Sequence, residues 1–145
     1  MNHHYQFYIA GRARNKENIL TICNTFEELN ISHYCFLKNE KSHKQAGLDL
    51  HDDHLAETFE SLELESPEVR ILFENDLKGI KSSENFLLVL PAGKSAHIEA
   101  GIAYGLGKKC YAVGEYEVTD SLYLIFDHIF KDENELKLFL SNQSV

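Results

Sequence analysis

Apolar residues along the chain follow two different spacings, and each spacing predicts one kind of element. Residues 86–90 (FLLVL) are a continuous apolar run of strand length, which is typical of a parallel strand covered on both faces. Other strand-like runs occupy residues 6–10, 31–37, 109–113 and 128–130. We therefore expect five strands.

Between these runs the apolar residues recur every three or four positions, which is the spacing of a helix with one buried face. This pattern predicts helices over residues 15–29 and 67–80 and a last helix near the C-terminus, and Ser66 is the predicted N-cap of the helix over residues 67–80. The turn at residues 91–93, followed by Ser95 as the predicted N-cap, indicates a further helix over residues 95–105.

Strands that alternate with helices imply an α/β fold with a parallel sheet. We expect a three-layer, doubly wound architecture of the flavodoxin or Rossmann type, in which helices cover both faces of a mostly parallel five-stranded sheet. The chain has 145 residues and no evident linker, repeat or low-complexity segment, which predicts a single domain over residues 1–145.

Composition narrows the range of functions. Hydrophobic residues make up 43% of the chain, as in ordinary globular proteins, and the net charge of -9 argues against a nucleic-acid polymer as partner. No signal peptide and no apolar run of roughly 18 residues is visible, so no membrane association is expected. Cys23, Cys35 and Cys110 lack metal-site spacing and are expected to be buried, reduced thiols of a cytoplasmic protein.

Glu99 is the leading candidate for chemistry. It lies in the first turns of the helix that follows residues 86–90, near the carboxyl end of a predicted buried strand. Ligands of open α/β sheets bind in the crevice at this edge. Taken alone, the carboxylate is explained equally well as a favourable partner of the helix dipole.

Three separated segments give Glu99 a context. They are residues 7–11 (FYIAG), 75–81 (NDLKGIK) and 97–108 (HIEAGIAYGLGK). In this order they resemble the nucleoside 2-deoxyribosyltransferase family and its relatives, the 2'-deoxynucleoside 5'-phosphate N-hydrolases. The turn before Glu99 is also similar to that of the Toll/interleukin-receptor-type NAD hydrolases and of the phosphoribohydrolases with a PGGxGTxxE motif.

The resemblance implies three catalytic residues. Glu99 would be the nucleophile that captures the sugar at C1', and Asp76 would be the acid that assists departure of the base. Tyr8 would hydrogen-bond the nucleophile and orient it. The alternatives are an exposed Asp76 that pairs with a nearby lysine and a Tyr8 that is only a core aromatic.

A second group of residues surrounds two predicted helix starts. Arg12 and Arg14 follow the turn at Gly11, and Ser95 follows the turn at Gly93. Guanidinium groups beside free helix amides suit a phosphate, and the N-hydrolase relatives bind a 5'-phosphate from these two turns. Glycine at position 93 departs from those relatives, which commonly carry an acidic or hydroxyl side chain there.

The remaining expectations concern metals and assembly. The histidine-rich segment with His43, His51 and His54 contains suitable metal ligands, but the resemblance implies no metal and no cofactor, and a segment that covers the substrate is the preferred interpretation. Residues 98–106 are apolar or small on nearly every side. One side must meet the sheet, and a second copy of the chain would cover the other in a homodimer. The first or last helix of the same chain is the alternative cover.

The predicted function is cleavage of an N-glycosidic bond, or (deoxy)ribosyl transfer, on a nucleoside or nucleoside 5'-monophosphate. Two alternatives stay open. One is a non-catalytic module that binds or senses nucleotides, and the other is a glycohydrolase of NAD or a related dinucleotide. The sequence does not distinguish between bases or between ribose and deoxyribose.

Overall fold

A single parallel sheet organises the molecule. The computed structural model describes residues 4–38, 57, 63–116 and 120–143. The sheet has five strands in the order β2-β1-β3-β4-β5, and all four strand pairs are parallel. The strands are β1 (Tyr5–Ala10), β2 (His33–Cys35), β3 (Ser83–Val89), β4 (Lys109–Val113) and β5 (Phe126–Phe130).

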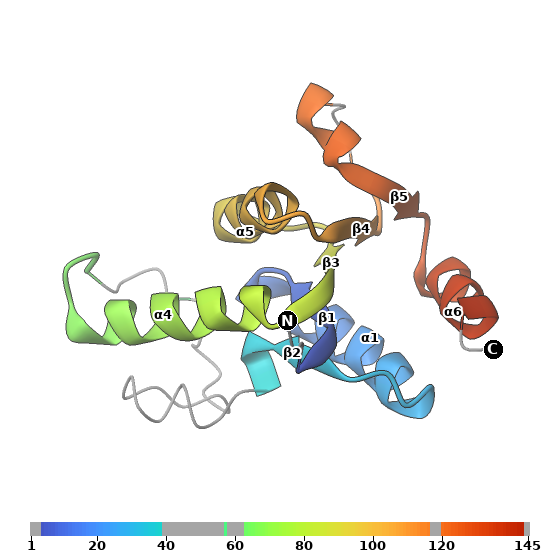
Figure 1. Ribbon diagram of the computed structural model, residues 1–145, viewed down its shortest axis with the longest axis horizontal. Coiled ribbons are helices and arrows are strands. Elements are labelled where there is room, and N and C mark those ends of the chain that lie inside the picture. The colour runs from blue at the N-terminus through green and yellow to red at the C-terminus, as the bar shows by residue number, and fades with distance from the viewer. Residues whose placement is uncertain (1–3, 39–56, 58–62, 117–119, 144–145) are drawn as a thin grey trace.

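Helices cover both faces of the sheet, so the predicted three-layer α/β fold is confirmed (Figure 1). Two helices pack side by side on one face and two on the other. The first pair is α4 (Pro67–Lys81) and α5 (Lys94–Gly105), and the second is α1 (Lys16–Glu28) and α6 (Glu133–Gln143). Three short 3-10 turns complete the described elements: η1 (Ala13–Asn15), η2 (Phe36–Lys38) and η3 (Ser121–Ile125).

The central strand β3 supplies both layers of the core. Leu87 and Val89 belong to the cluster under α1 and α6, whereas Phe86 and Leu88 belong to the cluster under α4 and α5. All four side chains are fully buried. Full burial of such a side chain contributes about 1.5–3 kcal/mol to stability. The residues on each face of β3 are therefore apolar, as the sequence predicted for a strand covered on both faces.

Helix starts and strand ends differ in part from the prediction. Ser66 is the N-cap of α4, as expected, and its hydroxyl accepts a hydrogen bond from the Val69 amide. The predicted cap at Ser95 is wrong, because α5 begins at Lys94 and Gly93 occupies the N-cap position. β2 is also shorter than predicted, because the chain enters the turn η2 directly after Cys35 and buries Leu37 there.

A glycine closes the carboxyl edge of the sheet beside β3. Gly114 follows β4 with a φ of 120°, and a Cβ at this position would lie 2.7 Å from the backbone oxygen of Leu90. Only glycine combines this backbone conformation with so close an approach. The end of β4 is therefore held against the turn that leads into α5.

Among the described residues, no helix is long and apolar enough to cross a membrane.

Candidate active site

The site lies at the point where the strand order reverses. β1 and β3 are neighbours at the centre of the sheet, and the chain leaves them in opposite directions, toward β2 from β1 and toward β4 from β3. α1 follows the carboxyl end of β1 and α5 follows that of β3, on opposite faces. Ligands of doubly wound sheets bind in the crevice at such a point.

Three aromatic rings form a ladder across the strands beside this point. Tyr8 of β1 is in register with Tyr34 of β2 and with Phe86 of β3. Its ring stacks on both, with centroids 5.1 Å from Tyr34 and 5.5 Å from Phe86, and with ring planes inclined by 14° and 9°. We call these three residues the aromatic ladder. It lies on the sheet face that α4 and α5 cover.

The Tyr8 hydroxyl donates a hydrogen bond to Oε2 of Glu99, which reaches down from α5. Tyr8 is buried, and burial together with the nearby carboxylates raises the pKa of its phenol well above the ordinary value. The group therefore stays a neutral donor over the whole physiological range. The structure thus brings Tyr8 and Glu99 into contact, as the sequence predicted.

Asp76 is held in the same way by a second tyrosine. The Tyr34 hydroxyl donates to Oδ1 of Asp76 at 3.0 Å, from β2 to α4. Asp76 is half-buried rather than exposed, so the alternative of a solvated acid does not apply. The sequence alone did not indicate Tyr34 as a site residue, because nothing in its local pattern separates it from a core aromatic.

Burial perturbs both carboxyl groups. It raises the pKa of Asp76 to about 6, against the lowering effect of the Tyr34 hydroxyl. Burial also raises the pKa of Glu99 to about 8, the charge of Asp76 adds to this increase, and the hydrogen bond from Tyr8 opposes it. Asp76 thus ionises first, and its charge then resists ionisation of Glu99. Between these two pH values the pair carries a single proton.

The two predicted phosphate-binding turns adjoin each other. A Cβ on Gly93 would lie 4.0 Å from the Cβ of Arg12, so the turn before α5 meets the turn after β1. The Asn15 side-chain amide connects them by donating to the backbone oxygens of Leu90 and Pro91, both at 3.4 Å. Asn15 was not predicted as a site residue, and its contact partners are 75 and 76 residues away in the sequence.

Packing at Gly11 explains how α1 comes so near to this edge. A Cβ on Gly11 would lie 2.6 Å from Cδ1 of Ile19, which is fully buried on α1. A larger residue would force the Ile19 side chain or the helix start to shift. Gly11 therefore allows α1 to pack closely against the end of β1.

The charged and hydroxyl groups of these turns are all exposed. Arg12, Arg14 and Ser95 face solvent, and the Arg14 guanidinium lies 3.8 Å from the Glu57 carboxylate. Ser95 lies in the first turn of α5 without acting as its cap. The structure brings Arg12 close to Gly93 across the two turns, whereas Arg14 is engaged with an acidic side chain.

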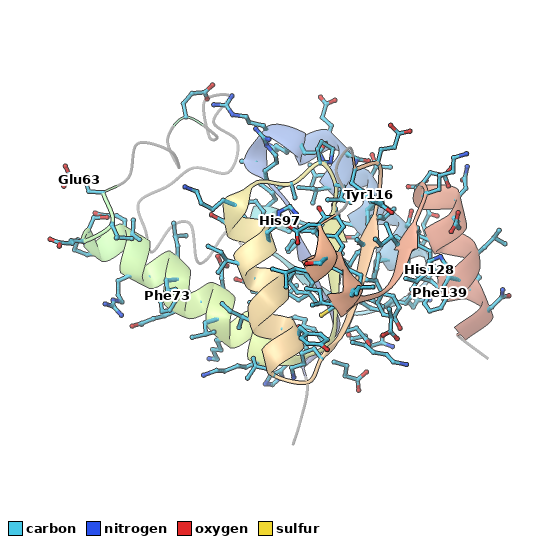
Figure 2. All side chains as sticks on the ribbon, turned by 90° about the horizontal axis from the view of Figure 1, so that it is seen from above. Glu63, Phe73, His97, Tyr116, His128 and Phe139 are labelled. Carbon is cyan, nitrogen blue, oxygen red and sulfur yellow. The ribbon has the colours of Figure 1, made fainter. Side chains whose placement is uncertain are left out.

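His97 bonds away from Glu99, although it is only two positions from it. Its Nδ1 lies 2.7 Å from the backbone oxygen of Gly93 and its Nε2 lies 2.8 Å from the Tyr123 hydroxyl. Figure 2 shows His97 on α5 at the end that faces η3. This histidine thus fastens the start of α5 to η3.

The described residues do not form a cluster of metal ligands. Residues 4–38, 57, 63–116 and 120–143 contain no group of three histidine, cysteine or acidic side chains that could hold a metal ion. The predicted histidine-rich candidates His43, His51 and His54 lie outside the described residues. Cys23, Cys35 and Cys110 are buried free thiols, as predicted.

Two solved structures share this architecture. A 2-deoxyribosyltransferase from the psychrotolerant bacterium Bacillus psychrosaccharolyticus has a TM-score of 0.61 and 18% sequence identity, over 90% of this chain and 89% of that chain. The CMP N-glycosidase BcmB of Clostridium botulinum has a TM-score of 0.55 and 18% identity, over 93% of this chain and 97% of that chain. The resemblance to the nucleoside 2-deoxyribosyltransferases is confirmed in the fold. No family model and no curated protein matches the chain by sequence.

Proposed function

We propose that the protein cleaves the N-glycosidic bond of a nucleoside or nucleoside 5'-monophosphate, with Glu99 as nucleophile. The observation that carries the proposal is the pair of half-buried carboxyl groups, each held by a tyrosine of the aromatic ladder. Such a pair, with one proton between two groups, provides the acid and the nucleophile that glycoside cleavage needs. The fold shared with a deoxyribosyltransferase and a CMP N-glycosidase supports the same chemistry.

The first step is capture of the sugar. Tyr8 occupies Oε2 of Glu99, which leaves Oε1 to attack C1'. As the bond between C1' and the base nitrogen breaks, its electron pair moves to the base, and Asp76 gives its proton to a base nitrogen. The products of this step are the free base, an ionised Asp76 and a glycosyl ester of Glu99.

The second step releases the sugar. The Asp76 carboxylate takes a proton from a water molecule or from the nitrogen of a second base, and that oxygen or nitrogen attacks C1'. The ester bond breaks and its electrons return to the Glu99 carboxylate. Water gives hydrolysis and a second base gives transfer, so the two reactions differ only in the acceptor.

Binding of the substrate must leave the shared proton on Asp76 rather than on Glu99. In the free site the proton resides mainly on Glu99, because its pKa is the higher of the two. Attack requires an ionised Glu99 and a protonated Asp76. A base nitrogen that accepts a hydrogen bond from Asp76 favours this arrangement, so the substrate itself helps to assemble the reactive form.

We propose that the adjoining turns at Arg12 and Gly93 recognise the 5' side of the sugar, where a monophosphate would meet a guanidinium group and the amides at the start of α5. Arg14 would contribute after release from Glu57.

We further propose that the working unit is a homodimer in the cytoplasm, formed through α5. The exposed fractions of Ile98, Tyr104 and Leu106 are 58%, 56% and 47%. α1 and α6 do not cover these side chains, because they pack on the opposite face of the sheet (Figure 1). A second copy would bury this apolar surface.

The proposed location in the cytoplasm rests on the three buried free thiols, which fit a reducing compartment.

A panel of substrates tests the proposed function. The purified protein is incubated at about pH 7, where the pair carries one proton, with nucleosides, nucleoside monophosphates and NAD, and free base is measured by chromatography. Release of base from a nucleoside or monophosphate is expected, and Glu99→Gln should lose it. Cleavage of NAD alone would favour the dinucleotide hydrolase, and nucleotide binding without base release from any substrate would favour the sensing module.

A further inference from the structure

Tyr34 takes no chemical step in the reaction proposed above, but its side chain is closely packed beside the site. Its ring stacks on Tyr8 and meets the edge of Tyr5, with centroids 5.6 Å apart and planes inclined by 69°. The side chain is buried, with 8% of its surface exposed. These contacts leave its ring little freedom to move.

The helix that carries Asp76 rests directly on this ring. Gly79 lies three residues after Asp76 on α4, and a Cβ at Gly79 would lie 3.1 Å from three carbon atoms of the Tyr34 ring. The missing side chain thus lets α4 approach β2 closely enough for the Tyr34 hydroxyl to reach Oδ1 of Asp76. Gly79, Tyr34 and Asp76 form one packed unit.

We propose that Tyr34 is a positioning residue for the base-side acid: its hydroxyl holds Oδ1 of Asp76, so that the transferable proton resides on Oδ2. This inference rests on the proposed function. In a neutral carboxyl group the carbonyl-type oxygen is the better acceptor. A donor fixed on Oδ1 therefore favours the form in which Oδ2 carries the hydrogen.

The aromatic ladder extends this argument to both carboxyl groups. Tyr8 and Tyr34 lie in register on adjacent strands, which are about 4.8 Å apart in a sheet. Each phenol holds one carboxyl group, Glu99 through Oε2 and Asp76 through Oδ1. The register of β1 and β2 thereby fixes one oxygen of the nucleophile and one oxygen of the acid.

The test uses Tyr34→Phe, which keeps the ring and its stacking and removes only the hydroxyl. Base release from a nucleoside whose base must be protonated is expected to fall about 10–100-fold. A substrate with an activated leaving group, such as a nitrophenyl deoxyriboside, needs no proton and should lose less than about threefold. Tyr5→Phe, which alters a tyrosine against the same ring, is the matched control and should change neither rate. Equal losses with both substrates, or no loss, would overturn the inference.

A carboxyl titration by nuclear magnetic resonance supplies a readout that does not depend on activity. Tyr34→Phe should raise the pKa of Asp76 further, because the hydrogen bond from Tyr34 favours the ionised form. An unchanged titration of Asp76 would overturn the inference. If the wild-type protein released no base at all, the proposed function would fail, and this titration would still decide whether Tyr34 holds Asp76.

Discussion

The two faces of the sheet differ sharply although the same strands form both. Under α1 and α6, residues such as Phe7 and Phe26 pack edge to face, with ring centroids 5.1 Å apart, in a continuous apolar core. Under α4 and α5, the neighbouring Tyr8 turns a hydroxyl toward a carboxylate that is partly removed from water. Both faces bury apolar side chains that stabilise the fold, but the α4/α5 face also holds polar groups whose burial is unfavourable in isolation. The proposed catalytic carboxyl groups thus lie on one face of the sheet, the face that α4 and α5 cover.

The largest effect is expected for activity on the α4/α5 face. Glu99→Ala should reduce base release by about 1,000-fold or more, because the nucleophile is lost. The protein should remain folded, because burial of the Glu99 carboxyl group is itself unfavourable. Initial rates of base release and circular dichroism measure the two effects. Undiminished turnover would remove Glu99 from the mechanism.

The opposite face should respond in stability instead. Phe26 is fully buried at the centre of the α1/α6 cluster. Phe26→Ala is expected to reduce the free energy of unfolding by about 3–5 kcal/mol through the cavity that it leaves. Urea denaturation at neutral pH gives this value, and the folded fraction should keep its rate per molecule. A loss below about 1 kcal/mol would show that Phe26 is not a central residue of this core.

The carboxyl groups should make stability depend on pH. Folding raises the pKa of Glu99 from an ordinary value of 4.5 to about 8. Between these values the folded state binds more protons than the unfolded state, so stability falls as the pH rises. Glu99→Gln does not titrate there and should gain on the order of 1–3 kcal/mol relative to wild type between about pH 5 and pH 9. Urea midpoints of the wild type and Glu99→Gln are measured at about pH 5 and pH 9. The same difference between the two proteins at both pH values would contradict the raised pKa of Glu99.

The smallest effect is expected at the exposed turns. Arg12→Gln should weaken binding of a nucleoside 5'-monophosphate by about 0.5–1.5 kcal/mol, because the guanidinium group is exposed, and should leave the matching nucleoside unaffected. Arg14→Gln is the control and should lose less, because Arg14 already pairs with Glu57. Isothermal titration calorimetry with both ligands measures the difference. Equal affinity of the wild-type protein for nucleoside and monophosphate would remove phosphate recognition from these turns.

Much of the fold followed from local pattern. The apolar run at residues 86–90 predicted a strand buried on both faces, and Ser66 predicted the start of α4, because these signals depend on residues close together in the sequence. The start of α5 was predicted wrongly, because serine is the stronger cap and was preferred over the glycine two residues before it. Of the two, Gly93 occupies the cap position in the structure.

Residues of the candidate site could be predicted only where a sequence motif marked them. Tyr8, Asp76 and Glu99 stood in segments with a family resemblance, and the structure brings them together. Tyr34 and Asn15 have no such motif. Their contacts depend on the register of β1 with β2 and on the meeting of two turns, which link residues 42 and 75 positions apart. Local sequence does not contain that information.

Detection of the covalent intermediate tests the central proposal most directly. A 2'-fluoro nucleoside should slow release of the sugar from the enzyme, because the fluorine destabilises the oxocarbenium-like transition state. Intact mass and peptide mapping should then show one glycosyl group on Glu99, and none on Glu99→Gln. A wild-type protein that releases base from the unmodified nucleoside, yet carries the glycosyl group on a different residue, would contradict the assignment of Glu99 as nucleophile.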